Sequence, residues 1–343
     1  MKRSIHRRLL HYLALLRRAG FYLAAIMVLL PVWLEPSLAL PGKVQDTLFV
    51  LDVSESMNVA DVDNPAPHTT RIQLAKSAIR EAMASLTCGS RVSLALFAGE
   101  DAVVLFEPLE ICRHFPAMEQ VVSRLDTHMR WIGDSRVAQG LSGAMKAAQS
   151  RKLNVVFVTD GDEMPHRSAP RLTEIQNERG KVRGVVMAVG GHAPLPVPKL
   201  NLQNEVIGYW TQEEAVKEGY HPNLLALVDG LEAGQHAPAG SLDEVGEHLS
   251  ATNPAYLKRL ANAGGLEFAK IDKVGDAVFA IQNPSLTRSA VAERDARWIF
   301  GLFAAALILV GWFKAELARF ISPWLRHSRR QVLSTEISFV DHE

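Results

Sequence analysis

The chain has little cysteine and no surplus of either charge: its 343 residues include two cysteines, and 37 basic side chains balance 37 acidic ones. Without a basic surplus there is no electrostatic footprint for phosphate, so nucleic acid is not an expected partner. The glycine-rich phosphate loop of nucleotide hydrolases is missing as well. Nucleotide hydrolysis by this chain is therefore not expected.

The two cysteines, Cys88 and Cys112, flank a predicted hairpin. Cys88 directly precedes an expected strand at 91–97, and Cys112 closely follows its expected antiparallel partner at 102–109. A hairpin returns the chain to the end where it started, so both cysteines fall at the same end of the sheet. This arrangement favours a structural disulfide over two free buried thiols.

Long apolar runs occur only near the two ends of the chain. The first 18 residues carry six basic side chains and no acid, and Phe21–Leu34 is apolar. Ser37-Leu38-Ala39 then resembles a small-residue cleavage site. Residues 1–40 are therefore predicted to be either a secretory signal peptide or an uncleaved N-terminal signal anchor, and both send the following domain out of the cytoplasm.

A second run, Trp298–Phe313, holds 16 residues without a charge. It is shorter than the ~20 residues usually needed to span a bilayer, but the long side chains of Arg297 and Lys314 reach toward the two interfaces. We predict a transmembrane helix at 298–313, with a buried core helix as the alternative. Basic residues in 314–343 then indicate a cytoplasmic tail. The expected location is a bacterial inner membrane, with the main domain in the periplasm.

Between these ends the sequence alternates strands and helices. Continuous apolar runs predict parallel strands buried on both faces, at 47–51, 154–159 and 182–189. Apolar residues at helical spacing predict covering helices at 71–86, 137–149 and 254–263. The predicted fold class is α/β: a doubly wound, mostly parallel sheet with one antiparallel edge strand, flanked by hydrophobic membrane segments. This domain is expected to span 44–282, with an irregular insertion at about 191–250.

Hydroxyl and carboxylate side chains follow the predicted strands. Asp52-Val53-Ser54-Glu55-Ser56 comes after the run at 47–51, and Asp160 comes after 154–159. Because parallel strands end at one edge of a sheet, both carboxylates are expected there, and Ser54 and Ser56 can both point inward. Taken alone, the pentapeptide is explained by a turn with side-chain hydrogen bonds to the backbone. A further hydroxyl, from Ser135 in a loop before a helix, strengthens the prediction of a metal site.

Oxygen ligands of this kind suit Mg²⁺, or else Mn²⁺ or Ca²⁺, better than Zn²⁺. Two carboxylates and three hydroxyls leave a coordination position for a carboxylate from a partner protein, which is a mechanism of recognition without catalysis. The predicted ligands are Asp52, Ser54, Ser56, Ser135 and Asp160, with Asp134 and Asp162 in the outer shell.

These segments resemble a von Willebrand factor type A domain with a metal-ion-dependent adhesion site. That pattern has Asp-x-Ser-x-Ser, then a threonine in a loop before a helix, then an aspartate after a strand. Ser135 stands where the family usually has threonine, and a serine hydroxyl can still act as a ligand. Residues 70–76 (Thr-Arg-Ile-Gln-Leu-Ala-Lys) and 96–99 (Leu-Phe-Ala-Gly) resemble the bacterial membrane-anchored branch of the family.

That branch includes Bat-type aerotolerance proteins and MxaL-type accessory proteins of methanol-dehydrogenase gene clusters. The resemblance implies partnership with a MoxR-type AAA+ ATPase and with related von Willebrand factor type A proteins. It also implies a role in assembly, maturation or metal insertion for a periplasmic enzyme such as methanol dehydrogenase. The 191–250 insertion is expected to carry specificity for that client.

Two other classes of function compete with this interpretation. A metal-dependent, phosphatase-like hydrolase needs an in-line nucleophile and an acid or base beside the metal. Ser54 stands where such an enzyme needs a second carboxylate, so the chain is predicted not to be an enzyme. A cell-surface adhesin fits poorly with the predicted second anchor and cytoplasmic tail.

Overall fold

The computed structural model describes residues 20–64, 66–133, 135–163, 172–211, 213–214 and 248–313. The chain divides into two compact units, one of Pro41–Ala292 and one that joins residues 1–40 to residues 293–343. Two predictions lie outside the described residues: Asp134 as an outer-shell residue and the tail at 314–343.

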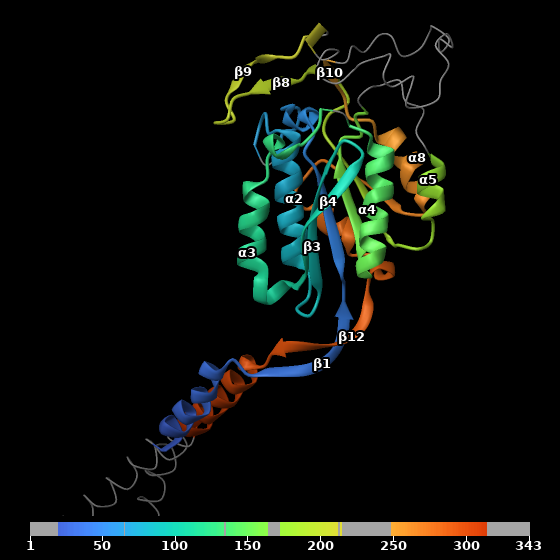
Figure 1. Ribbon diagram of the computed structural model, residues 1–343. Helices are drawn as coiled ribbons and strands as arrows, with labels where there is room; N and C mark the ends of the chain where they lie inside the picture. The colour runs from blue at the N-terminus through green and yellow to red at the C-terminus, as the bar shows by residue number, and fades with distance from the viewer. Residues whose placement is uncertain are drawn as a thin grey trace, which may run out of the picture. The chain divides into compact units, whose positions relative to one another are not determined.

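A six-stranded sheet with the order β11-β6-β5-β2-β3-β4 forms the centre of the larger unit (Figure 1). Its strands are β2 Thr47–Asp52, β3 Arg91–Ala98, β4 Asp101–Glu110, β5 Asn154–Thr159, β6 Gly184–Val189 and β11 Glu267–Ile271. Every neighbouring pair is parallel except β3 and β4, which is antiparallel and forms one edge. The prediction of a mostly parallel sheet with one antiparallel edge strand is confirmed.

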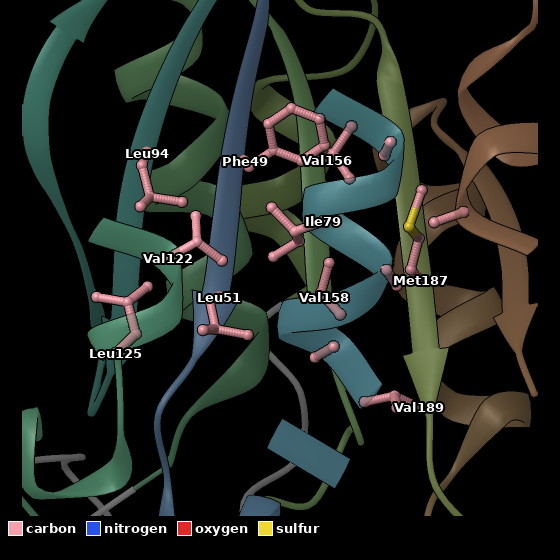
Figure 2. Close-up of a cluster of buried hydrophobic side chains, with 14 of the residues drawn as sticks. Phe49, Leu51, Ile79, Leu94, Val122, Leu125, Val156, Val158, Met187 and Val189 are labelled. Atoms are coloured by element: carbon pink, nitrogen blue, oxygen red, sulfur yellow. The ribbon is translucent and has the colours of Figure 1, made fainter. Parts of the chain in front are cut away.

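Helices cover both faces of this sheet, as the apolar strands require. One hydrophobic cluster packs Ile79 and Val122 against the face that carries Leu51, and Figure 2 shows these side chains. The helices around it are α2 Arg71–Ser85, α3 Ile111–Arg124 and α9 Asp276–Ile281. A second cluster fills the other face under α4 Val137–Arg151, α5 Leu172–Asn177 and α8 Pro254–Gly264.

The helices that matter for the site start and stop at residues suited to those positions. Helix α2 begins after Thr70, whose side chain and that of Gln73 form a reciprocal capping box. Helix α8 begins after Asn253, whose side chain accepts from the backbone N–H of Tyr256. It is capped at its other end by Gly265, with φ of +68°. These caps fix the residues at which α2 and α8 begin.

Cys88 and Cys112 form a disulfide with Cα atoms 5.3 Å apart. Cys88 lies just before β3, and Cys112 lies in the first turn of α3, immediately after β4. Because β3 is parallel to β2, this bridge lies at the edge where the parallel strands begin.

Short strands occupy the described part of the 191–250 insertion. β7 Leu195–Pro196 pairs with β10 Leu249–Ser250, and β8 Pro198–Leu200 pairs with β9 Val206–Tyr209. The sequence predicted an irregular insertion and did not predict these short strands. The pairing of β7 with β10 brings the two ends of the insertion together.

Residues 20–29 form a helix that continues into a short 3-10 helix at Leu30–Leu34. Residues 297–313, near the other end of the chain, are also helical. β1 Ser37–Val44 and β12 Arg288–Asp295 pair as a separate two-stranded sheet, which the sequence did not predict. Within the described residues, no helix combines the length and apolarity needed to cross a membrane. The spanning role of 298–313 stays a prediction.

Candidate metal centre

Asp52 is the last residue of β2 and is completely buried. Its Oδ1 accepts a hydrogen bond from the backbone N–H of Ser54 at 2.8 Å. Its Oδ2 accepts from the hydroxyl of Thr159, at the end of the neighbouring strand β5, at 2.5 Å. The carboxylate is therefore held in one orientation from its own turn and from the adjacent strand.

Asp160 directly follows β5 and is equally buried. Its Oδ1 accepts from the backbone N–H of Asp162 at 3.0 Å, and its Oδ2 accepts from Nη1 of Arg71 at 2.8 Å. Gly161, with φ of +76°, makes the turn between Asp160 and Asp162. Asp162 thus supports Asp160 through its main chain, and its negative charge acts on Asp160 as well.

These two carboxyl groups affect each other electrostatically. Burial, and then the negative charge of Asp160, raise the pKa of Asp52 to about 7. Burial also raises the pKa of Asp160, although the charge of Arg71 opposes that shift. Two ionised carboxylates in one buried place are unfavourable unless a cation neutralises them. A divalent metal would supply that charge.

Ser54 and Ser56 add two hydroxyls beside Asp52. Ser54 is the residue before the short 3-10 helix Glu55–Asn58, and Ser56 lies inside it. Their Oγ atoms are 3.0 Å apart, and both residues are buried. The turn therefore presents the two hydroxyls together, as the spacing of two residues predicts.

Ser135 reaches the same edge of the sheet from the loop before α4. It forms a parallel β-bridge with Gly99, just beyond the end of β3, and the N–H of Arg136 donates to the carbonyl of Gly99 at 2.8 Å. Its Oγ is buried and has no hydrogen-bond partner among the described residues. Buried hydroxyls are normally satisfied, so this one calls for an explanation, and coordination of a metal is one.

Arg71 is a residue of the candidate site that the sequence did not single out. It is the first residue of α2, it is completely buried, and it contacts Asp160, Asp61 and Ser250. Its position in the 70–76 segment was a signal, but the sequence identified that segment only as a family resemblance. Thr159, which orients Asp52, was also missed, although it lies next to Asp160.

Glu163 connects the Asp160 loop to two helices. Its carboxylate accepts from the backbone N–H of Ala138 in the first turn of α4 and from the hydroxyl of Tyr256 in α8. Burial raises the pKa of this carboxyl group. The contact with α4 ties the loop that carries Asp160 to the helix that follows Ser135.

The donor set fits a hard divalent cation. All five predicted ligands offer oxygen, and two of them are carboxylates. Within the described residues, each carboxylate oxygen of Asp52 and Asp160 accepts one hydrogen bond. Since a carboxylate oxygen has two lone pairs, each retains one for a metal. The structure brings Asp52, Ser54, Ser56 and Asp160 together and places Ser135 at the same edge.

Residues 47–163 match the family model described as von Willebrand factor type A domain. The match begins at the first residue of β2 and ends at Glu163, so it contains all five predicted ligands. It covers about a third of the chain. No curated protein matches the sequence.

Three solved structures illustrate what the chain is similar to. An aerotolerance-related membrane protein from Bacteroides fragilis is 16% identical with a TM-score of 0.45, over 69% of this chain and 96% of that one. BatB from Bacteroides thetaiotaomicron is 16% identical with a TM-score of 0.48, over 69% and 95%. Manganese-loaded TRAP protein of Plasmodium vivax is 14% identical with a TM-score of 0.35, over 76% and 82%. Likenesses this distant carry no inference about function.

Proposed function

We propose that this chain is a non-enzymatic binding protein that recognises a carboxylate of a partner protein through a divalent metal. The metal would be held by Asp52, Ser54, Ser56, Ser135 and Asp160. The observation that carries this proposal is the meeting of two buried carboxylates with buried hydroxyls at one edge of the sheet. The match of residues 47–163 to the von Willebrand factor type A family supports it.

The surrounding residues prepare this site for a cation. Thr159 and the Ser54 amide hold Asp52, while the Asp162 amide and Arg71 hold Asp160. These fixed bonds keep the carboxylates from turning away from one another. When bound, a metal neutralises their charges and offers a coordination position to an oxygen from outside.

An exposed apolar patch borders the site and indicates what the partner carries beside its carboxylate. Met129, Trp131 and Ile132, the rim patch, are 42%, 47% and 47% exposed. Arg130, within this loop, pairs with Glu55, which lies between the two hydroxyl ligands of the turn. Exposed apolar residues close together in the sequence, with a tryptophan among them, are typical of contact surfaces. We propose that the partner segment places an apolar side chain next to its metal-binding carboxylate.

The cellular setting of the proposal comes from the sequence. We propose an inner-membrane anchor, a periplasmic metal domain and a cytoplasmic tail that meets a MoxR-type AAA+ ATPase. The client would be a periplasmic enzyme undergoing assembly or metal insertion, with methanol dehydrogenase as the specific candidate. Mg²⁺ is the proposed physiological metal, and Mn²⁺ or Ca²⁺ would also fit the oxygen ligands.

Affinity purification of the full-length protein from membranes of its native organism tests this function. Wild type, Asp52→Ala/Asp160→Ala and the control Glu81→Ala, which removes an exposed charge on α2, are compared in Mg²⁺ and in EDTA. A partner retained by wild type and Glu81→Ala in Mg²⁺ alone is the expected result. Equal retention by all proteins in both buffers would contradict a metal-mediated contact.

A further inference from the structure

Arg71 makes an unusual set of contacts for a charged side chain that is completely buried. Its Nε and Nη2 bind both oxygens of Asp61, with the shortest distance 2.6 Å. Its Nη1 donates to Oδ2 of Asp160 at 2.8 Å and to Oγ of Ser250 at 2.6 Å. One rigid guanidinium therefore joins a predicted metal ligand to two other segments of the chain.

Through these segments Arg71 is connected to both stems of the 191–250 insertion, directly at Ser250 and through Asp61 at Gly191. Ser250 lies in β10, at the end of the insertion, and its carbonyl also accepts from Arg71. Oδ2 of Asp61 accepts from the backbone N–H of Gly191, at the start of the insertion, at 2.9 Å. The N–H of Thr252 donates to the carbonyl of Gly191, so the two stems are also bonded to each other.

The backbone at Gly190 leaves no space for anything larger than glycine beside this arginine. Gly190 has φ of +116°, and a Cβ there would lie 2.5 Å from Nε of Arg71. The chain thus passes beside Arg71 at Gly190, where the insertion begins. At the end of the insertion, Ser250 accepts hydrogen bonds from the same arginine. Both stems therefore lie against the side chain that holds Asp160.

We propose that Arg71 is a positioning residue that couples metal binding at Asp160 to the stems of the 191–250 insertion. The proposal rests on the proposed function, because it requires that Asp160 bind a metal. Coupling between two sites is reciprocal: a metal that fixes Asp160 stabilises the stems, and a partner that fixes the stems strengthens metal binding. A client that binds at the described stems can thereby regulate the metal site.

Two variants in the same stem separate coupling from general destabilisation. Ser250→Ala removes one hydrogen bond from Arg71 and leaves the carbonyl contact in place. Thr252→Ala is the matched control, since Thr252 is also buried and its hydroxyl donates to the carbonyl of Val189. Both variants lose one buried hydroxyl, but only the first loses a bond to Arg71.

The first measurement is a titration of the full-length protein in detergent with Mn²⁺. The electron paramagnetic resonance signal of free Mn²⁺ reports how much metal stays unbound. Ser250→Ala is expected to bind Mn²⁺ several-fold more weakly, which is less than the roughly tenfold cost of losing a direct partner of a ligand, because Ser250 acts on Asp160 through Arg71. Thr252→Ala is expected to bind as wild type does. Equal affinities for the two variants would overturn the coupling.

Hydrogen exchange at the amides of Gly191 and Thr252 is the second measurement and does not depend on affinity. Saturating Mn²⁺ is expected to slow both amides in wild type and in Thr252→Ala. In Ser250→Ala the amide of Thr252 is expected to slow less, because one of the two bonds between Arg71 and that stem is lost. If wild type binds Mn²⁺ but exchange at these amides does not change, the coupling is overturned and the proposed function is not. No Mn²⁺ binding by wild type would overturn the proposed function with it.

Discussion

Arg71 donates from Nη1 to Oδ2 of Asp160 across 2.8 Å, and neither side chain is exposed to solvent. The two residues are 89 positions apart in the sequence, so only the folded sheet brings them together. An ion pair in this setting gives limited net stabilisation, because both charges lose their hydration. Its value lies in fixing the direction of the Asp160 carboxylate.

Replacement of Arg71 tests how strongly the fold depends on this pair. Arg71→Met leaves Asp61 and Asp160 buried without their cation, so the free energy of unfolding is expected to fall by about 3–5 kcal/mol. Urea unfolding of the metal-free protein measures this loss. Combining Arg71→Met with Asp160→Asn should cost less than the sum of the single changes, because the second removes a charge that the first left unpaired. Strictly additive losses would contradict the pairing.

Much of the fold was predictable because buried parallel strands require continuous apolar runs, which residues 47–51 and 154–159 supply. The pairing of β1 with β12 was not, because Pro41-Gly42 interrupts any strand pattern in β1. Its partner also lies far along the sequence, and local patterns carry no information about it.

The site divides in the same way. Asp52, Ser54 and Ser56 form a local motif, and Asp160 follows a strand that parallel pairing places beside β2. Arg71 was missed because an arginine at the first position of an amphipathic helix is ordinarily exposed. Its burial is tolerable because Asp160, Asp61 and Ser250 all contact its guanidinium. Asp61 and Ser250 carry no motif that would have announced these contacts.

The raised pKa of Asp52 predicts how the metal-free protein responds to pH. A pKa raised from 3.8 to about 7 means that the folded state holds this proton more tightly than the unfolded state does. The resulting stabilisation is complete below pH 3.8 and is lost as the pH rises through about 7. Between pH 5 and pH 8, Tm of the metal-free protein should therefore fall more in wild type than in Asp52→Asn. An equal fall in Tm for the two proteins between pH 5 and pH 8 would contradict the raised pKa of Asp52.

The buried hydroxyl of Ser135 predicts opposite effects on stability and on metal affinity. Ser135→Ala removes a hydroxyl without a described partner, so the metal-free protein should be as stable as wild type or more so. Metal affinity should fall by about tenfold or more, because even an outer-shell loss costs that much. Ser142→Ala is the matched control, since its Oγ in α4 is likewise buried without a described partner. Equal Mn²⁺ affinity of the two variants would exclude Ser135 as a ligand.

Trp131 separates the contact surface from the metal. It is the aromatic member of the rim patch, so Trp131→Ala should weaken partner binding by about 2 kcal/mol, roughly 30-fold in Kd. Mn²⁺ affinity should not change, because no predicted ligand is altered. Leu109→Ala is the control: Leu109 is also exposed but pairs with Val92, at the opposite end of β3 from the site. Binding of a purified Mg²⁺-dependent partner to immobilised full-length protein gives the comparison. A partner that binds Trp131→Ala as tightly as Leu109→Ala would show that recognition depends on the metal and not on the rim patch.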